Sequence, residues 1–144
     1  MCTLVYIAAD GPLPTIPWDD TNPAFHVVEL TSPEDRRVES QFRKSHIYYM
    51  GAHEKCGCGF QYGQHPLADD DPDKMERKRE TMIRLAKYVS EAVTIYGSVQ
   101  IFACWCGDQE LPSTGHVTMK VTQLRSEPFW FSERLILTIV PDDA

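Results

Sequence analysis

The chain has 144 residues, of which 42% are hydrophobic and 24% are charged, and its net charge is −7. This length fits a single globular domain over residues 1–144, and the composition excludes a disordered chain or a fibre. No apolar run approaches the roughly 18 residues that a membrane span needs, and the acidic balance argues against nucleic acid as a partner.

The first ten residues contain neither a basic leader nor an apolar stretch with a small-residue cleavage site, so they do not resemble a signal peptide. We therefore expect a cytoplasmic protein with no membrane partner, whose five cysteines stay reduced. Their odd number also argues against a closed disulfide framework. The thiols should then be free, bound to a metal or redox-active.

Two strands are predicted near the amino terminus. Residues 2–9 form an almost continuous apolar run, which is typical of a strand buried on both faces in the middle of a sheet. Four prolines make 11–23 an irregular loop, in which Trp18 should fold back over the edge of the core. Residues 25–30 then predict a second strand.

A short helix and a third strand follow. Ser32 is a typical N-cap and Pro33 suits the first helical position, with Val38 and Phe42 spaced to form the buried side. Residues 46–50 predict the third strand, which we expect to run parallel to the second because a helix joins them.

The third strand leads into the most unusual segment of the chain, 51–63, which reads GAHEKCGCGFQYG. Glycine is used where the backbone takes a positive φ or where another group comes very close, and here it alternates with thiols. A second Cys-X-Cys, at Cys104 and Cys106, follows another predicted strand at 98–104. Two strands therefore end in the same pattern.

The long helix is predicted over 72–96, with Asp71 or Asp73 as its cap and Gly97 as its stop. Acidic residues before it, including Asp69 and Asp70, suit the positive end of the helix dipole. Residues 116–124 and 134–140 predict two more strands, expected to pair antiparallel. Together these elements indicate an α/β or α+β domain, with a mixed sheet of about six strands, one long helix and one short helix.

A metal site is the first chemical hypothesis for the cysteines. Four thiolates can surround Zn²⁺ tetrahedrally, so the candidate ligands are Cys56, Cys58, Cys104 and Cys106, with His53 or His65 as a nitrogen alternative. Residues two apart on a strand point to the same side, which would let the last two sulfurs converge. Packing in the core is the expectation for Cys2 and the alternative for Cys104, because both lie within apolar strands and free cysteine is often buried.

Three alternatives stay open. A thiol-dependent enzyme would use a loop cysteine whose pKa is lowered by backbone N–H groups and by His53. Gly57 and Gly59 could instead form a backbone nest for an anion, with the sulfurs incidental. A protein-interaction or immunity-type module would use Trp18, Trp130 and the basic face of the long helix. The leading hypothesis is a small binding or regulatory protein with a zinc site, whose small-molecule or protein partner the sequence does not name.

Overall fold

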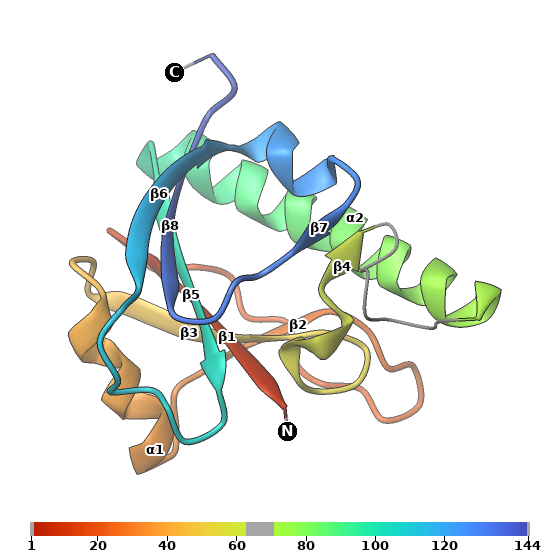
Figure 1. Ribbon diagram of the computed structural model, residues 1–144, viewed down its shortest axis with the longest axis horizontal. Helices are drawn as coiled ribbons and strands as arrows, with labels where there is room; N and C mark the ends of the chain where they lie inside the picture. Colours follow the sequence, from red (N-terminus) through yellow and green to blue (C-terminus); the bar gives the residue numbers. More distant parts are fainter. Residues whose placement is uncertain (1, 63–70, 144) are drawn as a thin grey trace.

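The computed structural model describes residues 2–62 and 71–143, and in it a six-stranded sheet packs against one long helix (Figure 1). The strand order is β2-β3-β1-β5-β8-β6. These strands are β1 Thr3–Ala9, β2 His26–Glu29, β3 His46–Gly51, β5 Val99–Trp105, β6 Gly115–Lys120 and β8 Leu135–Val140. A second sheet pairs β4 Gln61–Tyr62 with β7 Phe129–Trp130. The helices are α1 Pro33–Arg36 and α2 Pro72–Tyr96, with 3-10 helices η1 Arg37–Gln41, η2 Gly57–Gly59 and η3 Val121–Arg125. The predicted mixed sheet with one long and one short helix is confirmed.

Strand direction differs from the prediction at two places. Strands β2 and β3 pair antiparallel, because α1 and η1 pack over one face of the sheet without carrying the chain back along it. Strands β6 and β8 pair parallel, since η3 and β7 return the chain to the end of the sheet at which β6 began (Figure 1). Among the strands of the described residues, this is the one parallel pair.

The alternation of side chains along β1 divides the interior into two clusters. Val5 and Ile7 face α2 and belong to the larger cluster, which also takes in the buried side of that helix. Tyr6 faces the opposite side, where it packs with Phe102 and with Val38 of η1. Phe42 is partly buried against the same group, so the predicted buried side of the short helix is confirmed.

Helix α2 begins and ends as its sequence predicts. The Asp71 side chain accepts a hydrogen bond from the Lys74 N–H at 2.8 Å, and Gly97 ends the helix in the left-handed conformation with φ of 83°. Its buried residues start only at Thr81, and Met75 in the first turns is 36% exposed and lies outside the core. Asp69 and Asp70 lie outside the described residues.

The cap of α2 can be tested by replacing Asp71 with alanine. We expect Asp71→Ala to lower the free energy of unfolding by about 1 kcal/mol, because the Lys74 N–H loses its acceptor. Asp73→Ala is the matched control, because this acid lies in the same first turn but is not the cap. Its loss should lower the free energy of unfolding by only about 0.3 kcal/mol, through the helix dipole. Urea unfolding of both variants measures the difference. Equal losses would contradict the assignment of the cap.

Candidate metal site

The amino end of β1 lies between the carboxyl ends of β3 and β5. This follows from the antiparallel register, in which Val5 pairs with Met50 on one side and Thr3 pairs with Trp105 on the other. The Cys106 N–H donates to the Cys2 carbonyl at 3.0 Å and continues the second ladder beyond the strand. The segments that carry the two Cys-X-Cys patterns, Cys56/Cys58 and Cys104/Cys106, therefore lie at the same end of the sheet.

The glycines of the first segment let it pack closely, Gly57 on β1 and Gly59 on the residues that follow β3. A Cβ atom on Gly57 would stand 2.5 Å from Val5 Cγ2 and 3.0 Å from the Thr3 carbonyl oxygen. On Gly59 it would stand 2.8 Å from the Cβ of Ala52. Neither glycine has a positive φ, so close approach rather than backbone conformation requires them. Their role in binding an anion stays a prediction.

Three sulfur atoms gather where this segment meets β1. The Sγ atoms of Cys2, Cys56 and Cys58 all lie within 4.8 Å of one another. The Thr3 N–H points at Cys58 Sγ at 3.4 Å, which ties the loop to the start of the strand. Two thiolates of a tetrahedral zinc site stand about 3.8 Å apart, given Zn–S bonds of about 2.3 Å. Small side-chain adjustments would therefore bring these three sulfurs to one metal ion.

The cluster differs in membership from the predicted set. It includes Cys56 and Cys58 from the predicted ligands, and its third member is Cys2. The assignment of Cys2 to the core is wrong, because its side chain is exposed. Cys104 is fully buried beside Tyr6 on the sheet face opposite α2, so the structure does not bring it to the other thiols. Cys106 is exposed and is linked to Cys2 through the backbone.

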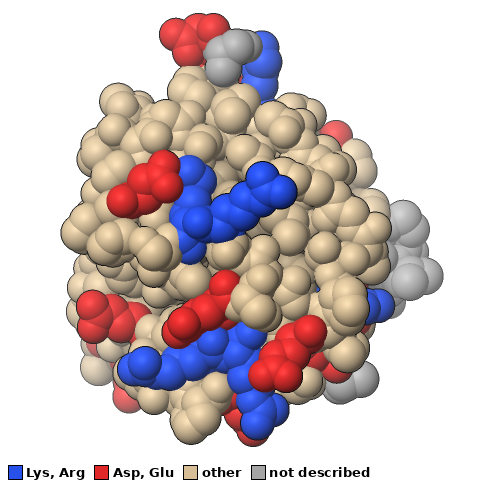
Figure 2. Space-filling model, turned by 90° about the vertical axis from the view of Figure 1, so that its left-hand side faces the viewer, with Lys and Arg blue, Asp and Glu red and all other residues tan. Residues whose placement is uncertain are grey.

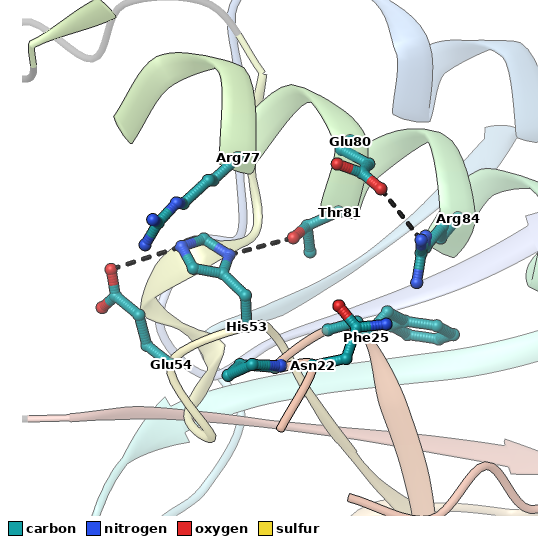
Figure 3. A pocket seen from close by; sticks show the side chains of 10 residues that line it. Asn22, Phe25, His53, Glu54, Arg77, Glu80, Thr81 and Arg84 are labelled. Atoms are coloured by element: carbon teal, nitrogen blue, oxygen red, sulfur yellow. Dashed lines mark hydrogen bonds and ion pairs between the residues drawn. The ribbon is translucent and has the colours of Figure 1, made fainter. Parts of the chain in front are cut away.

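His53 faces α2, and both of its ring nitrogens have partners. Its Nδ1 lies 3.0 Å from Thr81 Oγ1, and its Nε2 lies 3.4 Å from a carboxylate oxygen of Glu54 (Figure 3). Burial lowers the pKa of the imidazole, and the Glu54 carboxylate partly opposes this shift. His53 thus serves the packing of its loop against α2, while His65 lies outside the described residues.

The space in front of His53 is a cavity of about 430 Å³ whose charged side chains largely offset one another (Figure 3). Arg77 and Arg84 enter it from α2 together with Glu80, and Arg84 pairs with that glutamate at 2.9 Å. Glu54 supplies a second carboxylate from the loop. Figure 2 shows the same mixture on one face of the whole molecule, where Lys and Arg stand beside Asp and Glu.

Two of the residues considered for an interaction module, Trp18 and Arg79, have contacts within the protein. The Trp18 ring packs edge-on against His26 at 4.8 Å between centroids, and Lys55 Nζ lies 5.1 Å from its centre. The predicted return of this tryptophan onto the fold is confirmed. On α2, Arg79 lies 3.4 Å from a carboxylate oxygen of Glu127, so part of the basic face is paired.

Burial also governs the ionisation of the thiols. It raises the pKa of Cys56 to about 12, and the neighbouring Cys58 thiol adds to the shift, although a hydrogen bond with the Cys58 backbone acts in the opposite direction. Burial raises the pKa of Cys104 to about 12 as well. The lowered thiol pKa expected for a thiol-dependent enzyme is therefore wrong for Cys56, because desolvation outweighs the backbone donor.

No family model, curated protein or solved structure matches this chain. Within residues 2–62 and 71–143, no helix combines the length and the apolar character that crossing a bilayer requires. The arrangement of side chains is therefore the basis for assigning a function.

The close approach of the loop predicts a large effect for one small substitution. Gly57→Ala should lower the free energy of unfolding by about 1–3 kcal/mol, since the added methyl group would push the loop away from Val5 and the Thr3 carbonyl. Gly115→Ala is the control, because its Cβ would meet only Leu135 Cδ1 at 3.4 Å, an ordinary contact. Chemical denaturation compares the two. Similar stabilities would show that the loop does not need its glycine.

The raised pKa of Cys56 predicts slow alkylation at neutral pH. In folded, metal-free protein, the rate of Cys56 carboxamidomethylation should still increase between pH 9 and 10.5, because the thiolate remains a minor species below its pKa of about 12. In urea the same cysteine should titrate near its ordinary value of about 8.5. Peptide mapping by mass spectrometry follows this residue alone. A rate that levels off below pH 8 in the folded protein would favour the thiol-enzyme hypothesis instead.

Proposed function

We propose that this protein binds one zinc ion through Cys2, Cys56 and Cys58 and acts as a small zinc-dependent binding or regulatory protein. The observation that carries the proposal is the approach of three sulfurs to within 4.8 Å of one another, from two segments that are distant in sequence. Packing of the loop on β1 creates this approach, so the site exists only in the folded chain.

The chemistry of the three groups supports zinc. Thiolates are soft ligands that favour Zn²⁺, Cu⁺ or iron–sulfur clusters over Mg²⁺ or Ca²⁺. Backbone N–H groups support the sulfurs: that of Thr3 points at Cys58, and that of Cys58 at Cys56. Such donors offset the negative charge that accumulates when several thiolates share one metal ion.

The high pKa of Cys56 does not oppose metal binding. A metal ion competes with the proton for the sulfur, so binding releases protons and the apparent affinity increases with pH. A thiol that is protonated without metal also resists oxidation, because the thiolate is the reactive form. The Cys56 thiol should therefore resist oxidation before a metal ion binds.

The number of ligands bears on the role of the ion. Within the described residues the cluster contains three cysteines, two of them exposed to solvent. Sites that only support a fold usually have four protein ligands, whereas sites that bind or activate another molecule keep one position for it. Three thiol ligands, two of them exposed, thus favour a binding role over a purely structural one.

Metal analysis of matched cysteine variants tests the proposal. Protein prepared without a histidine tag should contain one zinc ion per chain. Its affinity, measured by competition with a chromogenic chelator, should drop by more than about 100-fold in Cys2→Ser, Cys56→Ser and Cys58→Ser, because loss of an outer-sphere partner alone costs about 10- to 100-fold.

Cys104→Ser is the control, since this cysteine is fully buried and is not one of the three clustered thiols. It should keep the zinc affinity of the parent, with circular dichroism to verify that the buried hydroxyl has not unfolded the protein. Freshly reduced protein with no stoichiometric metal, or an equal loss of affinity in the folded control, would contradict the proposed site.

A further inference from the structure

A cavity of about 340 Å³ lies directly beside the cysteine cluster. Cys58 belongs to both, because it lines the cavity and is one of the three clustered thiols. Four of the other nine lining residues are aromatic, namely Phe60, Trp105, Trp130 and Phe131, and the rest are Thr3, Gly57, Gln61, Cys104 and Glu133. A metal ion held by the cluster would therefore lie at the edge of an apolar chamber.

The walls of this chamber come from separate parts of the fold. Trp105 ends β5 and pairs with Thr3, so it stands at the end of the sheet where the cluster lies. Trp130 is in β7, which pairs with β4 to form the small sheet beside α2 (Figure 1). Both tryptophans reach the cavity, Trp130 with 37% of its surface exposed.

The aromatic walls are held in place by packing. Phe60 is 2% exposed and meets Phe131 edge-on, with 5.9 Å between ring centroids. Phe131 in turn contacts Phe129, which is buried in the main core. An incoming molecule would therefore meet a wall that is already formed, which reduces the entropy lost on binding.

We propose that this chamber binds a flat aromatic or heteroaromatic molecule of one or two fused rings, and that a nitrogen or sulfur donor on that molecule completes the coordination of the zinc ion. This inference rests on the proposed zinc site and names the class of ligand that the site takes. The volume is at the small end of ligand cavities, which suits a compact ring system.

Two features of the chamber select such a ligand. Aromatic side chains bind ring systems through offset or edge-on contacts, which a flexible aliphatic chain does not make. Three thiolates leave a tetrahedral zinc ion with one further position, and Cys58 places the metal at the chamber wall. A ring that carries a donor atom satisfies both requirements at once.

Benzimidazole is a suitable probe, since it has two fused rings and a nitrogen donor. Saturation-transfer NMR should detect contact between its ring protons and the zinc-loaded protein. Trp130→Ala and, as a second variant, Trp105→Ala should each weaken binding roughly 3- to 10-fold, in line with the loss of one aromatic contact. Trp18→Ala is the control with the same chemical change, because that ring packs on His26 and does not line the chamber.

Cobalt substitution tests the contact with the metal. The visible absorption bands of the Co²⁺ form should shift when benzimidazole is added, and indene, which has the same fused-ring shape without the nitrogen, should leave them unchanged. The cobalt spectrum should be the same in Cys106→Ser, which excludes that nearby cysteine as the fourth ligand.

Absence of saturation transfer, equal binding by the parent and both chamber variants, or a cobalt spectrum that benzimidazole does not alter would each overturn the inference. A cobalt spectrum that changes in Cys106→Ser would do the same. Metal analysis of the same samples distinguishes this outcome from failure of the zinc site. If the protein contains stoichiometric zinc but does not bind benzimidazole, the proposed function stands and only the inferred ligand class is wrong.

Discussion

The pairing of β1 with two antiparallel neighbours is the constraint on which the candidate site depends. Because β3 and β5 both run opposite to β1, their carboxyl ends lie on either side of its amino end. Side chains that are far apart along the chain thus meet at one edge of the sheet. Had β3 been parallel to β1, the loop that carries Cys56 and Cys58 would have left the sheet at the other end, and these cysteines could not have reached Cys2.

The glycine-rich loop turns this shared edge into a site. Its backbone lies against Val5 and the Thr3 carbonyl at a distance that excludes any Cβ, which brings Cys56 and Cys58 to Cys2. Close contact with the strand also desolvates Cys56 and raises its pKa. The same packing therefore gathers the thiols and keeps the Cys56 thiol protonated at neutral pH.

The fold places polar and apolar environments on either side of segment 53–60. Toward α2, His53 and Glu54 face a cavity in which arginines and glutamates offset one another. Toward β7, Cys58 and Phe60 face a chamber lined by aromatic rings. With zinc bound as proposed, thiolate ligands next to an apolar wall would suit recognition of a ring system carrying a donor atom, because the wall would contribute binding area and the metal would contribute orientation.

Local signals in the sequence determined most of the elements. The Asp71 cap, Pro72 and the Gly97 stop identified α2, since capping and helix propensity act over a few residues. The apolar runs identified the strands, and the alternating glycines and thiols identified the loop as a place of close approach. The same signals singled out Cys56 and Cys58, which are two of the three clustered cysteines.

Only the tertiary structure decided which residues join them. Strand direction and register are set by packing over the whole sheet, and they place Cys2 at the shared edge while burying Cys104 in the cluster around Tyr6.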